Sequence, residues 1–168
     1  DEDKLEKLLN LIDKTKKELK TKIPIVIKIS PDISDNETIK ISQILLKYDV
    51  KALIISNTTE AGRENLKDMQ KYQKGGLSGK PLENKSNKMI NKFYNLLEDK
   101  IKIIGVGGVD SGKSAYEKFL SGASYIQLYT GMVFQGPSVV SKIKKELKEI
   151  LISKDVKNYR EIIGKKRN

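Results

Sequence analysis

Apolar residues recur along this chain in two patterns, one with helical spacing and one as short runs rich in β-branched side chains. Helical spacing predicts an amphipathic helix over residues 3–20, through Leu5, Leu8, Leu9, Ile12 and Leu19. Short apolar runs predict four strands, over residues 23–29, 50–56, 101–104 and 124–128. Further helices are predicted between and after them, over residues 35–48, 81–98, 112–121, 137–152 and 156–163.

Local signals mark where these helices begin and end. Ser34 and Glu37 form a capping box before the second helix, Pro81 opens the third, and Gly164 stops the last. Residues 57–80 form a long polar loop that ends in Gly-Gly-Leu-Ser-Gly-Lys. A loop of this length inside a compact domain is usually functional, often as a lid or a binding loop.

The alternation of strand and helix is typical of an α/β fold with a parallel sheet. Four strands alone leave two open sheet edges and one exposed apolar face. We therefore predict that residues 1–168 form the C-terminal half of a (β/α)8 TIM barrel and supply about its last four βα units. A small doubly wound sheet is the alternative.

Composition removes several kinds of chemistry. The chain contains no cysteine and no histidine, which excludes thiol nucleophiles, imidazole acids and bases, and zinc sites built on these ligands. No metal site is predicted. The 33 basic residues exceed the 22 acidic ones and give a formal net charge of +11. Because the lysines alternate with Glu and Asp on polar helix faces, we expect solvated surfaces and no nucleic-acid partner.

In a barrel of this kind the carboxyl ends of the strands converge on the active site. These ends carry Lys28, Ser56 to Thr58, Val106 to Gly108, and Leu128 to Thr130. Lys28 interrupts an apolar strand, so it either faces a cofactor that gains negative charge or reaches solvent from an edge strand. Asn57 either reads an amide or carboxylate edge of a ligand or caps its turn.

Two glycine turns follow strands and precede helices, where backbone N–H groups form phosphate sites. The segment 107–114 also matches the P-loop pattern, in which Lys113 would contact phosphates and Ser114 a magnesium ion. Its alternative is an exposed first helical turn at Gly112 and Lys113. Ser78 and Gly79 either close over a ligand from the long loop or form an ordinary turn. A phosphate- or nucleotide-binding α/β module thus remains an alternative function.

Five motifs in order resemble the C-terminal half of a class 2 dihydroorotate dehydrogenase: 27–32, 55–59, 75–82, 104–109 and 127–130. The Gly-Gly-Leu-Ser-Gly-Lys-Pro-Leu block of residues 75–82 favours class 2 over the soluble class 1 enzymes. The resemblance implies an FMN enzyme of de novo pyrimidine biosynthesis. It would oxidise dihydroorotate to orotate and pass electrons to a quinone at the bacterial or mitochondrial inner membrane.

The resemblance also implies roles for residues of this chain. Lys28 would lie at the N1/O2 edge of the flavin and Ser56 would contact the flavin nearby. Asn57 and Thr58 would bind the orotate ring. Backbone amides would hold the flavin tail and phosphate at Ser78, Gly79, Val106, Gly107, Gly108, Leu128, Tyr129 and Thr130. The family's catalytic base is a serine of the first barrel half, so we expect no catalytic base here. The upstream half, which also carries the membrane-associating helices, is an expected partner.

Overall fold

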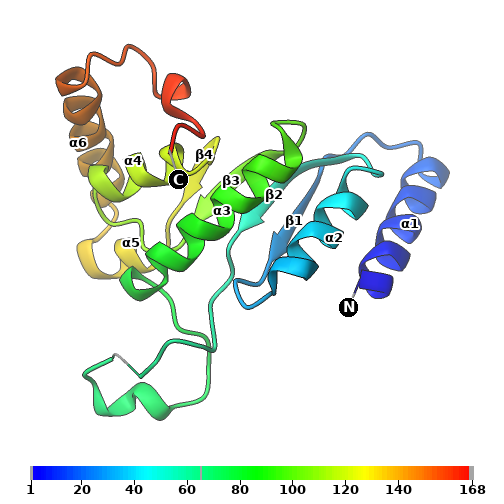
Figure 1. Cartoon of the computed structure of the whole chain (residues 1–168), viewed down its shortest axis with the longest axis horizontal. Helices are drawn as coiled ribbons and strands as arrows, with labels where there is room; N and C mark the ends of the chain where they lie inside the picture. The colour runs from blue at the N-terminus through cyan, green and yellow to red at the C-terminus, as the bar shows by residue number, and fades with distance from the viewer. Residues whose placement is uncertain (1, 65, 167–168) are drawn as a thin grey trace.

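Four parallel strands form the centre of the computed structural model, which describes residues 2–64 and 66–166. They are β1 (Ile25–Ile29), β2 (Val50–Ile55), β3 (Lys102–Val106) and β4 (Tyr125–Gln127). The sheet order is β1-β2-β3-β4, and every neighbouring pair is parallel. Each strand therefore pairs with the next one in sequence, which confirms the predicted α/β fold with a parallel sheet (Figure 1).

Helices connect the strands and cover one face of the sheet (Figure 1). They are α1 (Glu2–Glu18), α2 (Asp35–Leu45), α3 (Glu83–Leu97), α4 (Gly112–Leu120), α5 (Thr130–Gln135) and α6 (Val139–Ser153). Short 3-10 turns occur at Met69–Tyr72, Lys80–Leu82 and Tyr159–Ile162. The capping box predicted at Ser34 is present, since the Ser34 side chain accepts from the Glu37 N–H.

The core lies between the sheet and these helices. Leu53, Ile55 and Ile103 point from the strands into one buried cluster with residues of α2 and α3, including Ile44, Leu45, Ile90, Phe93 and Leu97. On the opposite face, Val26 and Tyr125 are 44% and 54% exposed. Within the described residues the apolar face is open, and neither β1 nor β4 pairs with a second strand, as expected of four strands.

Some predicted helices differ from the observed ones, and one short observed helix was not predicted. Pro81 lies in a 3-10 turn, and α3 begins two residues later at Glu83. The helix predicted over residues 156–163 is wrong, because the Asn158 side chain caps Arg160 and leaves only one 3-10 turn before Gly164. Helix α5 was not predicted, since six residues are too few to show helical periodicity.

The apolar stripe predicted for the first helix is only partly buried. Leu9 is buried, whereas Leu8 and Leu19 are 53% and 69% exposed. Helix α1 packs beside α2 at the end of the layer, so a single narrow stripe of its surface is covered.

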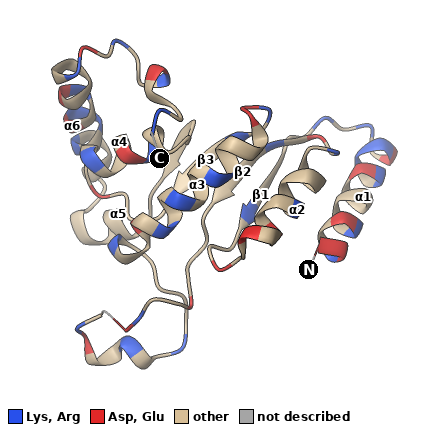
Figure 2. Cartoon of the chain, viewed as in Figure 1, with Lys and Arg blue, Asp and Glu red and all other residues tan. Residues whose placement is uncertain are grey.

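Basic and acidic residues both occur along most of the helices, as the colours of the ribbon show (Figure 2). Lys40 of α2 forms an ion pair with Glu2 of α1, and Lys47, two residues beyond α2, forms one with Glu6, each with an N···O distance of 3.0 Å. This interleaving of cations with carboxylates is the solvated pattern that the sequence predicts for the lysine-rich faces.

Candidate functional site

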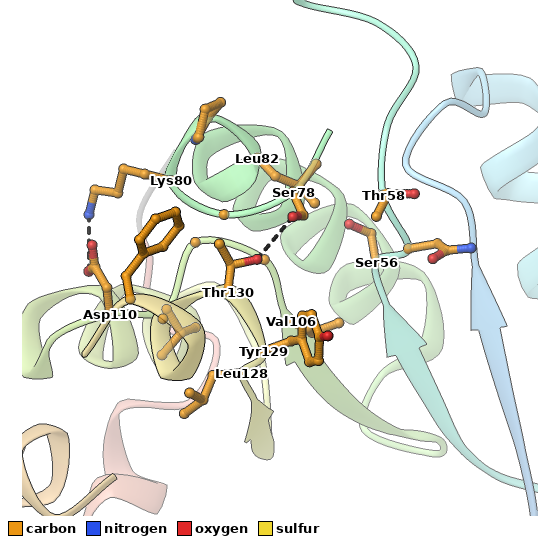
Figure 3. A pocket seen from close by; sticks show the side chains of 18 of the residues that line it. Ser56, Thr58, Ser78, Lys80, Leu82, Val106, Asp110, Leu128, Tyr129 and Thr130 are labelled. Atoms are coloured by element: carbon orange, nitrogen blue, oxygen red, sulfur yellow. Dashed lines mark hydrogen bonds and ion pairs between the residues drawn. The ribbon is translucent and has the colours of Figure 1, made fainter. Parts of the chain in front are cut away.

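A pocket of about 470 Å³ lies at the carboxyl ends of the strands (Figure 3). Lys28 of β1 and the chain segments that follow β2, β3 and β4 contribute to it, together with the end of the long loop. All twelve residues that the resemblance assigns to the flavin or the substrate line it: Lys28, Ser56, Asn57, Thr58, Ser78, Gly79, Val106, Gly107, Gly108, Leu128, Tyr129 and Thr130. The structure thus brings together residues up to about a hundred positions apart in the chain.

Backbone hydrogen bonds beyond the strand ladders hold the strand ends together. The Ser56 N–H donates to the Val106 carbonyl at 3.2 Å, and the Asn57 N–H donates to the Ile29 carbonyl at 2.9 Å. The first bond joins the ends of β2 and β3, and the second joins the ends of β1 and β2. The side chains of Asn57 and Thr58 remain exposed at the pocket.

Ser56 is the most unusual polar residue of the pocket. Its side chain is only 2% exposed, and its Oγ has no hydrogen-bond partner among the described residues. A buried hydroxyl without a partner carries the full cost of its desolvation. The hydroxyl therefore fits a site at which a bound ligand provides the missing partner.

The turn at Gly107 and Gly108 adopts a backbone conformation that favours glycine, with φ values of +112° and +75°. A Cβ atom on Gly108 would lie 2.4 Å from the Cβ of Glu83 and 2.9 Å from its Cα. The turn is therefore packed tightly against the start of α3. Within the described residues, the N–H groups of these two glycines donate to no carbonyl or side chain, so they remain available to an anion.

The end of the long loop closes against the turn after β4. Ser78 Oγ lies 2.9 Å from Thr130 Oγ1, and the two hydroxyls form a hydrogen bond (Figure 3). Gly79 has a φ of +78°, and a Cβ there would lie 2.9 Å from Thr130 Cγ2. The close approach of the two segments explains why glycine occupies this position.

Hydrogen bonds hold both ends of the long loop together close to the sheet. Thr59 and Leu77 exchange backbone hydrogen bonds of 3.1 and 2.7 Å. The Asp32 carboxylate accepts from the Thr59 hydroxyl, the Glu60 N–H and the Lys85 ammonium. Burial raises the pKa of Asp32, but the bonds from Lys85, Thr59 and Glu60 outweigh it and hold this pKa below its usual value.

Lys28 lies on the open face of the sheet, in register with Ile54 of β2. Its side chain is exposed and lines the pocket. Among the described residues it forms no hydrogen bond or ion pair. Strand β1 is an edge strand of the sheet, as the solvent-exposed interpretation of Lys28 expected. Lys28 nevertheless also lines the pocket, as the cofactor-facing interpretation expected.

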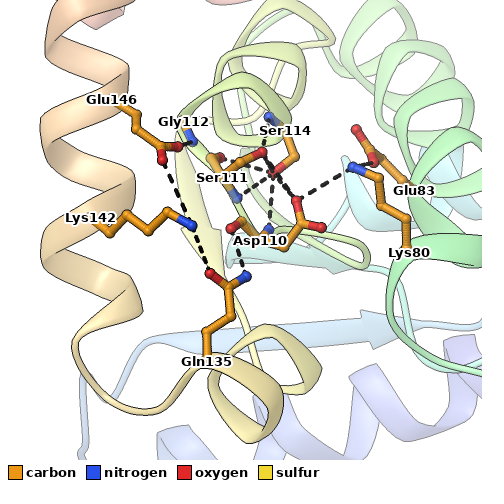
Figure 4. A network of polar contacts seen from close by, with 9 residues as sticks. All are labelled: Lys80, Glu83, Asp110, Ser111, Gly112, Ser114, Gln135, Lys142 and Glu146. Atoms are coloured by element: carbon orange, nitrogen blue, oxygen red, sulfur yellow. Dashed lines mark hydrogen bonds and ion pairs between the residues drawn. The ribbon is translucent and has the colours of Figure 1, made fainter.

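The P-loop interpretation fails on local hydrogen bonding (Figure 4). Ser114 is 1% exposed, and its Oγ accepts from the N–H groups of Asp110 and Ser111, each at 3.0 Å. The Gly112 N–H donates to a carboxylate oxygen of Glu146 at 2.6 Å. The donors that a phosphate would need are therefore already bound to protein atoms. Lys113 is exposed and lies outside the residues that line the pocket.

The expectation that Gly112 is exposed is wrong. This glycine is buried, and a Cβ on it would lie 2.4 Å from the Cβ of Glu146 and 2.5 Å from the Leu147 nitrogen. The reason is that α4 and α6 pack closely at this point.

Several pocket residues were missed by sequence reasoning, among them Lys80, Asp110, Phe134 and Gln135. Lys80 pairs with Asp110 at 3.4 Å and with Glu83 at 2.6 Å, which links the long loop to the turn after β3. The hydrogen bond from Lys80 to Glu83 raises the pKa of the Lys80 ammonium. Lys80 stands in the glycine-rich block of residues 75–82, which was a signal for its position.

A further missed residue is Lys118, which lies directly behind the pocket. Its side chain is completely buried, and its Nζ donates to Ser86 Oγ and Asn87 Oδ1. Burial lowers the pKa of Lys118 to about 7. No local sequence pattern marks this lysine, since its neighbours follow an ordinary amphipathic helix.

Comparisons with known proteins give a consistent result. The sequence model of the family described as dihydroorotate dehydrogenase matches residues 2–151. A protein of Idiomarina loihiensis named dihydroorotate dehydrogenase (quinone) is 44% identical over 131 residues, which cover 78% of this chain and 39% of the relative. A mouse protein named as the mitochondrial form is 39% identical over 140 residues, covering 83% of this chain and 35% of the relative.

Solved structures of dihydroorotate dehydrogenase from Eimeria tenella are similar as well. The complex with ferulenol has a TM-score of 0.92 and 30% identity, and it covers 98% of this chain and 48% of that one. The ligand-free form has a TM-score of 0.81 and 36% identity, and the match covers 83% of this chain and 39% of that one. The chain thus spans less than half the length of these relatives, and its four parallel strands correspond to part of their barrel. By sequence and by fold, the chain belongs to the dihydroorotate dehydrogenase family.

Proposed function

We propose that this chain provides the FMN-binding part of a quinone-dependent dihydroorotate dehydrogenase, which oxidises dihydroorotate to orotate in pyrimidine biosynthesis. The observation that carries the proposal is the buried, unpartnered hydroxyl of Ser56, which faces a pocket lined by every residue expected to bind the cofactor or substrate. Family membership and the names of the relatives support the same reaction.

The residues of the pocket fit a flavin mononucleotide. A glycine turn with available N–H groups suits a phosphate, and an unpaired buried hydroxyl and a nearby cation suit the polar edge of a ring system. The pocket volume lies in the range typical of small-molecule sites. When bound, the flavin would supply the acceptor for a hydride from dihydroorotate.

Within this proposal each group of residues has its own task. Gly107, Gly108 and the Ser78–Gly79 segment hold the phosphate end through backbone amides, together with the other pocket turns at Val106 and at Leu128, Tyr129 and Thr130. Asn57 and Thr58 orient the substrate ring with their exposed polar side chains. Lys28 places a positive charge at the pocket edge on which negative charge develops, and such a fixed charge lowers the barrier.

Other parts of the reaction are assigned to the upstream half of the barrel. We propose that this half carries the proton-abstracting base, binds quinone, and attaches the protein peripherally to the membrane. Across residues 2–64 and 66–166, no helix has the length and apolar character needed to cross a membrane.

Replacing Lys28 by alanine in the full-length protein is expected to slow flavin reduction by dihydroorotate by about 10²–10³. The fold should be unaffected, because the side chain is exposed and has no protein partner among the described residues. Stopped-flow absorbance measures the rate. Lys22→Ala, an exposed lysine just before the same strand, is the control. Reduction of Lys28→Ala at the wild-type rate would contradict the assigned role.

Replacing Ser56 by alanine should weaken FMN binding without destabilising the apoprotein. The apoprotein should be as stable as the wild type or more stable, because an unpaired buried hydroxyl is removed. The FMN dissociation constant should rise by about tenfold, because the ligand loses its partner. Thermal melting and fluorescence titration measure the two quantities. Ser42→Ala is the matched control, since Ser42 is equally buried but bonds to the Thr38 carbonyl at 2.8 Å. It should destabilise the protein and leave FMN affinity unchanged.

Lys113→Ala should leave FMN content unchanged, since the side chain lies outside the pocket. Gly107→Ala should lower the FMN content. Residue 107 has a φ of +112°, which disfavours a side chain, and the added Cβ would lie only 3.1 Å from Leu82. Absorbance of the purified proteins gives the flavin-to-protein ratio. The reverse ordering of these two variants would favour a P-loop and argue against the flavin site.

A further inference from the structure

Lys118 of α4 is buried at a position that does not touch the pocket. The side chain has no exposed surface, and it crosses behind β3 at Gly105. A Cβ on Gly105 would lie 3.1 Å from Lys118 Cδ. A glycine inside a strand often marks such a close approach. The strand therefore leaves room for the stem of this lysine.

The Nζ atom of Lys118 has hydrogen-bond acceptors but no counter-ion. It donates to Ser86 Oγ at 3.0 Å and to Asn87 Oδ1 at 2.7 Å, and both partners are buried on α3. Among the described residues no carboxylate lies within ion-pair distance of it. Burial lowers the pKa of this amine, and Glu83 at longer range only partly opposes that effect. A neutral amine carries two N–H groups, which match these two acceptors.

The burial of an amine is costly, and an apolar side chain of similar length would fill the same volume without that cost. The position therefore calls for a hydrogen-bond donor. Without Lys118, Ser86 Oγ and Asn87 Oδ1 would each lose a donor in a region with little access to water, and unsatisfied buried acceptors are expensive.

Ser86 carries this interaction onward to the sheet. Its hydroxyl accepts from Lys118, and its single proton is donated to the Val106 carbonyl at 2.6 Å. The Ile55 carbonyl lies at the longer distance of 3.5 Å from the same oxygen. Val106 also accepts the Ser56 N–H at 3.2 Å. A continuous chain of donors thus runs from α4 through α3 to the ends of β2 and β3.

We propose that Lys118 is a positioning residue for the cofactor site, which acts through Ser86 and the Val106 carbonyl. It fixes the strand ends from which Ser56 and the Gly107–Gly108 turn enter the pocket. Neither Lys118 nor Ser86 lines the pocket, so the effect on a ligand is transmitted through the backbone. The inference rests on the proposed function, because the ligand that it serves is the flavin proposed above.

The test compares two links of this chain of hydrogen bonds in the full-length protein. Lys118→Met keeps the volume and removes the donor, and Ser86→Ala removes a single oxygen atom. Each should raise the FMN dissociation constant by about tenfold. In the double variant the FMN dissociation constant should also rise by about tenfold. The two effects should not multiply, because both residues act in one network. The visible circular dichroism of bound flavin should change in all three.

The matched control is Phe119→Leu, on the next position of the same helix. Phe119 is buried and packs against the Tyr159 ring at a centroid distance of 4.7 Å, away from Ser86. This variant should lower the melting temperature and leave FMN affinity and the dichroism spectrum unchanged. It separates a general loss of stability from a loss of positioning.

A second readout does not depend on the cofactor. Amide hydrogen exchange of the apoprotein should accelerate in Lys118→Met and Ser86→Ala at Ser56, whose N–H donates to the Val106 carbonyl. Residues 25–29 of β1 should exchange as in the wild type. Faster exchange limited to the strand ends is the expected sign of a local loss of positioning.

Wild-type FMN affinity in both single variants, with unchanged exchange at Ser56, would overturn the proposal. If Lys118→Met does not fold, FMN affinity and exchange at Ser56 in Ser86→Ala decide whether the proposal holds, since this variant removes only one oxygen atom. If the wild-type protein binds no FMN, the proposed function fails, whereas the exchange experiment still decides whether Lys118 holds the strand ends.

Discussion

The carbonyl of Val106 is the group on which the geometry of the pocket most depends. Hydrogen bonding between parallel strands ends at the strand tips, and the turns that follow have no ladder to hold them. Here the Val106 carbonyl accepts one donor from Ser56, just after β2, and another from Ser86 of α3. These two bonds extend the order of the sheet into the turns. The backbone at Ser56 and Val106 is consequently held by protein atoms before any ligand binds, which reduces the entropy that binding must overcome.

The two glycine-rich parts of the segment 107–114 show how local hydrogen bonding decides function. Gly107 packs against Leu82 and Gly108 against Glu83, which holds the turn in place. The N–H groups of both glycines remain available among the described residues. A few residues later, the Asp110 N–H donates to Ser114 and the Gly112 N–H donates to Glu146 of α6, so protein side chains satisfy the start of α4. The same kind of backbone donor therefore serves ligand binding in one turn and helix stability in the next, although the sequence pattern joins both turns into one motif.

The pocket residues at the strand ends were predictable from strand position, whereas Ser78 and Gly79 were expected from the glycine-rich end of the long loop. Parallel strands present their carboxyl ends at one edge, so locating four apolar runs was enough to bring Lys28, Asn57 and the glycine turn together. Lys118 was not predictable in this way, since its partners Ser86 and Asn87 lie more than thirty residues away and their contact depends on how α3 and α4 pack. The burial of Gly112 against α6 and the exposure of Leu8 on α1 depended on helix packing for the same reason.

The open face of the sheet bears on the electrostatics proposed for Lys28. In register with it lies Ile54, and the row continues through Ile104 to Tyr125, which is more than half exposed. A charge that faces water is strongly screened, whereas the same charge beside a covered apolar surface acts at a lower effective dielectric constant. The relatives are more than twice as long as their matched segments, and the proposed upstream half would cover this face. The influence proposed for Lys28 on the flavin would therefore depend on the closure of the barrel as well as on its own position, whereas the bonds to Val106 arise within this chain.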